Sequence, residues 1–133
     1  MTLPIIALEA TSNTPAVAAD WTAGRVSMGG DSYPENSFEF FGPLIAAIEA
    51  YLEQGRAPLH LELRIVYMNT SSVKAMMDIF DMMEAASRQG RSLSVAWHYQ
   101  VRTERVVEMI EEFKEDCSFP FEILAETAED LAF

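Results

Sequence analysis

Cysteine and basic residues are scarce in this chain. Cys117 is the one cysteine among 133 residues, so the protein can form neither an intramolecular disulfide nor a metal site of two or four cysteines. Lys and Arg number 9 against 21 Asp and Glu, which gives a formal net charge of −12. Nucleic acids and anionic membrane surfaces attract clustered positive charge, so this composition excludes both as direct partners.

Long apolar runs and catalytic signatures are missing as well. No segment approaches the length of a membrane-spanning helix, and the N-terminus lacks the basic segment of a signal peptide, so we expect a cytoplasmic protein. The sequence has no glycine-rich phosphate loop, no GxSxG and no HExxH motif, so we expect no catalytic residues, no metal and no cofactor. The remaining enzymatic alternative is a small enzyme that uses His98 or Cys117.

What is present is the hydrophobic pattern of one folded domain. Half of the residues are hydrophobic, and a chain of this length can bury a single core. We expect one domain over residues 1–133, with a loose arm or edge strand at 1–13 and an acidic tail at 126–133. The apolar spacing predicts a hairpin within 14–30, helices over about 36–55, 71–87 and 103–115, and strands over 59–68, 93–99 and 119–124. Asn36, with Glu39 three residues later, predicts the cap of the first helix.

Strands that alternate with helices are typical of an α/β domain. We expect a mixed, largely parallel sheet with an antiparallel hairpin edge and helices packed against it. In the strand at 59–68, apolar and polar side chains alternate as far as Arg64, and then Val66 and Met68 make the second face apolar too. We therefore expect this end of the strand to be covered on both faces.

Negative charge is concentrated near the C-terminus. Residues 104–130 contain ten acidic and two basic side chains, a net charge of −8 out of the chain's −12. A solvated helix end is the simpler explanation of this cluster. The asymmetry along the chain also favours a basic protein partner.

Asn69-Thr70-Ser71-Ser72 falls where the central strand meets the second helix, and two interpretations of it remain open. In the first, one hydroxyl, for example that of Ser71, caps the helix by accepting a hydrogen bond from a backbone N–H. In the second, a hydroxyl of this turn is phosphorylated. The carboxyl end of a parallel strand exposes functional groups, and the helix N-terminus tolerates the added negative charge.

The helix that follows has a wide apolar arc. Lys74 and Asp78 lie on its polar stripe, and Met77 falls within this stripe, so we expect Met77 to be exposed. The apolar residues cover about 180° of the helix, more than the ~100° typical of a surface helix. The arc is therefore either core throughout or core plus a methionine-rich docking surface, since methionine repacks easily against partners.

Several segments, in the same order, resemble the SiaC family of bacterial regulatory phosphoproteins. The resemblance covers about residues 14–123 and rests on several motifs together. These are Gly30-Asp31-Ser32-Tyr33-Pro34-Glu35-Asn36-Ser37, Asn69-Thr70-Ser71-Ser72-Val73-Lys74-Ala75-Met76-Met77-Asp78-Ile79, Trp97-His98-Tyr99, and Glu112-Phe113 through Glu115-Asp116-Cys117-Ser118-Phe119-Pro120-Phe121. The family resembles STAS domains, the fold of anti-sigma-factor antagonists, which implies a STAS-like fold here.

The resemblance implies a partner-switching protein rather than an enzyme. Family members are phosphorylated on a threonine by a partner protein kinase and dephosphorylated by a partner protein phosphatase. The unphosphorylated form binds and activates a diguanylate cyclase, which raises cyclic di-GMP and promotes biofilm formation. The family's phosphothreonine falls on Thr70, with Ser71 and Ser72 as rival acceptors.

An anti-sigma-factor antagonist that acts on a sigma-regulating kinase is the alternative function. Such antagonists carry an Asp-x-Ser-Gly-like segment where this chain has Asn69 and Thr70 with no glycine following, which makes this alternative less favoured. For the partner-switching protein, which is the leading hypothesis, phosphate on Thr70 would place charge inside an apolar interface and abolish a modest complex. We expect partners to contact the turn and the helix after it, at Asn69, Thr70, Ser71, Ser72, Lys74, Met76, Met77 and Phe80.

Overall fold

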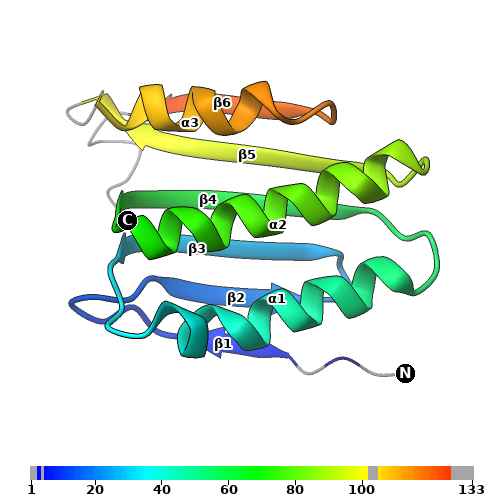
Figure 1. Cartoon of the computed structure of the whole chain (residues 1–133), viewed down its shortest axis with the longest axis horizontal. Helices are drawn as coiled ribbons and strands as arrows, with labels where there is room; N and C mark the ends of the chain where they lie inside the picture. The colour runs from blue at the N-terminus through cyan, green and yellow to red at the C-terminus, as the bar shows by residue number, and fades with distance from the viewer. Residues whose placement is uncertain (1–2, 4, 102–104, 127–133) are drawn as a thin grey trace.

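The described residues form one six-stranded mixed sheet, with the strands in the same order as in the chain (Figure 1). The structure is a computed structural model that describes residues 3, 5–101 and 105–126. The strands are β1 (Ile6–Leu8), β2 (Ala16–Asp20), β3 (Arg25–Ser32), β4 (Leu59–Met68), β5 (Leu93–Gln100) and β6 (Phe121–Glu126). Strands β3 to β6 are parallel, and β1 and β2 add an antiparallel edge. The predicted α/β architecture is confirmed.

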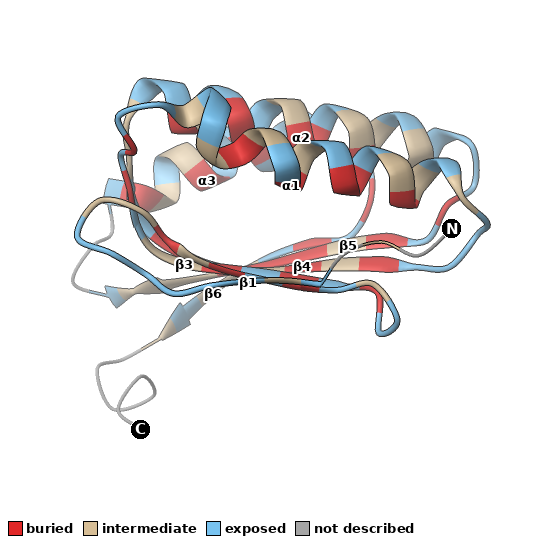
Figure 2. Cartoon of the chain, turned by 90° about the horizontal axis from the view of Figure 1, so that it is seen from below, coloured by how far each residue is buried: buried red, intermediate tan, exposed pale blue. Residues whose placement is uncertain are grey.

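The helices α1 (Ser37–Glu53), α2 (Thr70–Arg88) and α3 (Arg105–Glu115) all lie on one face of the sheet (Figure 2). Each helix joins two neighbouring parallel strands, and the strand order never reverses. Crossovers of the same hand then place every helix on the same face. The core fills the layer between helices and sheet, and its largest fully buried side chains are Trp97, Phe41, Ile48, Leu59, Leu61, Leu63, Ile65, Met76, Ile79, Met83, Ile110 and Val26.

The opposite face of the sheet carries no helix in the described part of the chain (Figure 2). The prediction that the end of β4 is covered on both faces is therefore wrong. The register of β3 against β4 skips Val66, because Gly30 pairs with Ile65 and Asp31 with Tyr67. Such a bulge reverses which side chains face the core, and both Val66 and Tyr67 are exposed.

Asparagine side chains begin the first two helices. Asn36 Oδ1 accepts a hydrogen bond from the backbone N–H of Glu39 at 3.1 Å, which confirms the predicted cap of α1. Asn69 Oδ1 accepts one from the backbone N–H of Ser72 at 2.9 Å, and α2 begins at Thr70. The cap of α2 is therefore Asn69, and the interpretation in which a hydroxyl such as that of Ser71 caps this helix is wrong.

Arg91 ties the end of α1 to the start of β5. Its side chain is buried, and its cation lies over the ring of Tyr51, 5.3 Å from the ring centroid. The guanidinium donates to five backbone carbonyls, those of Ala57 (2.6 Å), Leu52 (2.8 Å), Gly55 (3.0 Å), Tyr51 (3.1 Å) and Gln54 (3.3 Å). The last carbonyls of a helix have no partner within the helix, so this arginine satisfies them from outside.

Replacing Arg91 by lysine should destabilise the fold. An ammonium keeps the charge but cannot match the flat fork of five N–H donors, so carbonyls at the end of α1 lose their partners. We expect the free energy of unfolding to fall by about 2–4 kcal/mol in urea denaturation. Arg56→Lys is the matched control, since Arg56 is an exposed arginine in the adjacent loop. Equal stability of the two variants would contradict this role of Arg91.

Candidate phosphorylation and docking site

Thr70 is the first residue of α2, at the point where β4 ends. Its side chain is exposed, and its hydroxyl has no hydrogen-bond partner among the residues that the structure describes. The free N–H groups of the first helical turn lie beside it, and the positive end of the helix favours an anion there. Thr70 is thus accessible and chemically suited to carry a phosphoryl group.

The two serines that follow Thr70 have different roles. Ser72 is fully buried, and its hydroxyl lies 2.8 Å from the hydroxyl of Ser32 at the end of β3. The prediction of Ser72 as a rival acceptor does not fit this burial, because a kinase cannot reach its oxygen in the folded protein. Ser71 is exposed, but its hydroxyl bonds to that of Ser37 at 2.6 Å and to Asn69 Oδ1 at 3.2 Å.

A groove of about 580 Å³ runs between α1 and α2, which lie side by side (Figure 1). Its floor is apolar, and its rims carry polar residues of both helices. Ser71 and Lys74 line it on the side of α2, and the Lys74 ammonium lies 3.2 Å from Asp78. The full lining is Ser37, Phe38, Phe41, Gly42, Ile45, Ala46, Glu49, Ala50, Glu53, Ser71, Lys74, Ala75 and Asp78.

Phe38 stands at the end of this groove nearest Thr70. Its side chain is 87% exposed, although phenylalanine is usually buried. Sequence reasoning missed this residue. Phe38 lies three residues before Phe41 and so falls on the apolar stripe of α1. The sequence alone does not reveal that the sheet and the neighbouring helix leave this end of the stripe uncovered.

The predicted docking residues of α2 divide into two groups. Met77 is exposed, as its place in the polar stripe predicted. Met76 and Phe80 are 0% and 4% exposed, and this burial does not fit their prediction as docking residues. The physical reason is that α2 lies between α1 and α3 (Figure 1), so its wide apolar arc packs on both neighbours and on the sheet. Phe80, for example, contacts the ring of Phe113 on α3, with centroids 5.2 Å apart.

Comparison with known proteins identifies the family. The sequence profile of the SiaC family regulatory phosphoproteins matches residues 8–126. This chain belongs to the SiaC family. An uncharacterized protein of Pseudomonas aeruginosa (strain UCBPP-PA14) is 59% identical over 115 residues, which cover 86% of this chain and 91% of that protein.

Solved structures of SiaC share the fold. The crystal structure of apo-SiaC from Pseudomonas aeruginosa is 54% identical, with a TM-score of 0.88 over 92% of this chain and 99% of that one. A chain from the crystal structure of the diguanylate cyclase SiaD in complex with its activator SiaC, from the same organism, is 56% identical. Its TM-score is 0.89 over 91% of this chain and 99% of that one.

The other candidate groups of this SiaC family protein lie elsewhere. His60 and His98 lie on the face of the sheet that carries no helix, where both contact Glu62. The described residues contain no group of three or more His, Cys, Asp and Glu side chains that could hold a metal ion. Within the same residues, no helix has the length and apolar character needed to cross a membrane.

Cys117 follows α3 in a half-buried position. Burial raises the pKa of its thiol to about 11, and the carboxylates of Glu84, Asp116 and Asp81 add to this effect. Its Sγ donates to the carbonyl of Phe113 at 3.3 Å. A thiol with such a pKa is not an activated nucleophile, so this residue gives the enzymatic alternative no support.

Alkylation of Cys117 should be slow in the folded SiaC family protein. At about pH 8, a thiol with a pKa near 11 has about a hundredth of the thiolate of an ordinary cysteine. We therefore expect iodoacetamide to modify the native protein about a hundred times more slowly than the protein unfolded in urea, as followed by intact mass. Similar rates for the two forms would contradict the predicted environment of the thiol.

Proposed function

We propose that this SiaC family protein binds and activates a diguanylate cyclase, and that phosphorylation of Thr70 prevents binding. The observation that carries the proposal is the 56% identity and TM-score of 0.89 to a chain from the complex of SiaD with its activator SiaC. A protein kinase and a protein phosphatase act on Thr70 in this scheme. The protein itself catalyses nothing; its phosphorylation state controls which partner it can bind.

The docking surface that we propose has three parts. Phe38 supplies an exposed aromatic anchor, and the groove between α1 and α2 supplies an apolar floor beside it. Thr70, Lys74 and Met77 form one exposed face of α2, since residues four and seven apart lie on the same side of a helix. Asn69 and Ser72 support this surface from below, because their side chains hold the first turn of α2 in place.

Phosphate on Thr70 acts against docking through charge. It adds about −1.5 to −2 charges, which the N-terminus of α2 and the ammonium of Lys74, one turn further on, accommodate in the free protein. When an apolar partner surface covers it, the same charge loses its water, at a cost of several kcal/mol. The unphosphorylated protein docks without this cost. The switch therefore requires no change of fold.

Binding to the cyclase should depend on phosphate at Thr70. We expect protein carrying phosphothreonine at residue 70 to bind a diguanylate cyclase at least about tenfold more weakly than unphosphorylated protein, measured by titration calorimetry. Protein with Ser71→Ala, phosphorylated at Thr70, is the control and should show the same loss. Equal affinity of the two phosphorylation states would overturn the mechanism. Co-purification with a sigma-regulating kinase instead of a cyclase would favour the alternative function.

Phe38→Ala should weaken docking without affecting the fold. An exposed aromatic anchor at the centre of an interface contributes more than about 2 kcal/mol, so we expect at least about a thirtyfold loss of cyclase affinity. Val66→Ala is the matched control, because Val66 is also an exposed apolar side chain but lies at the bulge of β4. Unchanged affinity of the Phe38 variant would place the docking surface elsewhere.

A further inference from the structure

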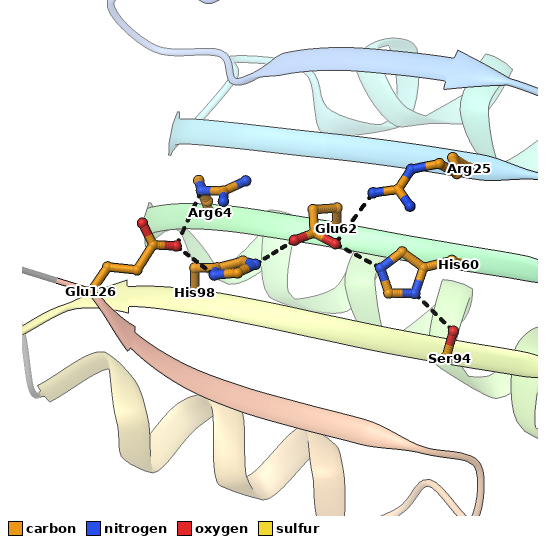
Figure 3. Close-up of polar contacts among 7 residues, drawn as sticks. All are labelled: Arg25, His60, Glu62, Arg64, Ser94, His98 and Glu126. Atoms are coloured by element: carbon orange, nitrogen blue, oxygen red, sulfur yellow. Dashed lines mark hydrogen bonds and ion pairs between the residues drawn. The ribbon is translucent and has the colours of Figure 1, made fainter. Parts of the chain in front are cut away.

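Seven polar side chains form a connected cluster on the face of the sheet that carries no helix (Figure 3). They come from four neighbouring strands, which are β3, β4, β5 and β6. The two carboxylates at its centre, Glu62 and Glu126, are only 19% and 12% exposed. The members are Arg25, His60, Glu62, Arg64, Ser94, His98 and Glu126.

A neutral ring satisfies every contact of His60. Its Nε2 lies 2.6 Å from Glu62 Oε2, and its Nδ1 lies 2.7 Å from the hydroxyl of Ser94. With one proton, on Nε2, the ring donates to the carboxylate and accepts from the serine hydroxyl. His60 therefore needs no second proton.

The surroundings of His98 differ from those of His60. Its Nε2 contacts Glu62 Oε1, and its Nδ1 contacts Glu126 Oε1, so each ring nitrogen faces a carboxylate oxygen (Figure 3). An ionised carboxylate only accepts hydrogen bonds, and a neutral imidazole has only one N–H. In either neutral tautomer, one nitrogen lone pair would point at a negative oxygen. Only the imidazolium, with a proton on each nitrogen, suits both neighbours.

Hydrogen bonds hold Glu62 in the charged form. Burial alone would raise the pKa of Glu62, but hydrogen bonds from His60 and His98 outweigh it, so the pKa lies below the ordinary value. Glu126 Oε1 is buried and receives no well-aligned hydrogen bond within the described ranges. Charge holds it instead, through Nδ1 of His98 and through Nε of Arg64 at 3.3 Å.

We propose that His98 is an imidazolium that fastens the end of β6 to β4 and β5, and that this fastening is released as the pH rises. Loss of one ring proton leaves a lone pair opposite one carboxylate. Among the described residues, Glu62 keeps His60 and Arg25, whereas Glu126 keeps Arg64 alone, so the contact with Glu126 is the one that breaks. The fastening is therefore present at lower pH, while the ring is protonated, and is lost as the ring deprotonates.

The charged groups that face His98 set the sign of this effect. Glu62, Arg64 and His60 come from β4, Glu126 comes from β6, and Arg25 of β3 acts through Glu62. Glu122, also on β6, is exposed. The three described helices lie on the other face of the sheet (Figure 2). Both ring nitrogens of His98 thus face carboxylates, and Arg64 pairs with Glu126 rather than with the ring.

Nitrogen NMR of the imidazole rings tests the proposal directly. In ¹⁵N-labelled full-length protein at about pH 7, we expect His98 to show two protonated nitrogens and His60 to show one, on Nε2. In Glu126→Gln, the amide can donate to an unprotonated Nδ1, so His98 should show a single protonated nitrogen. A neutral His98 ring in the unmodified protein at this pH would overturn the proposal without reference to any variant.

Amide hydrogen exchange tests the consequence for β6. We expect the protection factors of the β6 amides, which are corrected for intrinsic exchange, to fall between about pH 6 and pH 8.5. This fall should exceed that of the β2 protection factors by at least about tenfold. In Glu126→Gln, the two strands should change in parallel, because the ion pair is absent. Parallel behaviour of β6 and β2 in the unmodified protein would overturn the release of β6.

Discussion

The sequential order of the parallel strands is the constraint on which the rest of the structure depends. Because each crossover moves one strand along in the same direction, all three helices lie on one face and begin at the same edge of the sheet. The starts of α1 and α2 are therefore neighbours, joined by the hydroxyls of Ser37 and Ser71. Thr70 and Phe38, which are far apart in the sequence, both lie at this edge as a result, in the first turns of their helices.

The same constraint leaves one face of the sheet without a helix. A sheet face exposed to water must carry polar side chains, and strands β3 to β6 place arginine, histidine and glutamate there. In a chain with a net charge of −12, this cluster gathers two arginines and both histidines around two carboxylates. The two faces thus have different chemistry: the helical face carries the exposed hydroxyl of Thr70 beside an apolar groove, and the open face carries a cluster of ionisable side chains.

Local sequence patterns correctly predicted the features that depend on interactions between residues close together in the chain. The alternation in β4 gave its bounds, Asn36 was identified as a cap, and the polar stripe of α2 predicted that Met77 is exposed. The predictions that failed concern residues whose burial depends on segments far away in the chain. The burial of Met76 and Phe80 follows from the place of α2 between two helices, and the exposure of Val66 follows from a bulge against β3. The Ser32–Ser72 bond also joins segments that no local pattern connects.

The anchoring of α1 has a consequence for how a partner is recognised. Arg91 fixes its last turn, and the cap of Asn36 and the bond between Ser37 and Ser71 fix its first. Both ends of α1 are thus immobilised relative to the sheet and α2 before any partner arrives, and the groove is preorganised. The entropy cost of ordering at the interface then falls mainly on the incoming protein. In the mechanism that we propose, phosphate changes the surface charge of this rigid receptor while its shape stays the same.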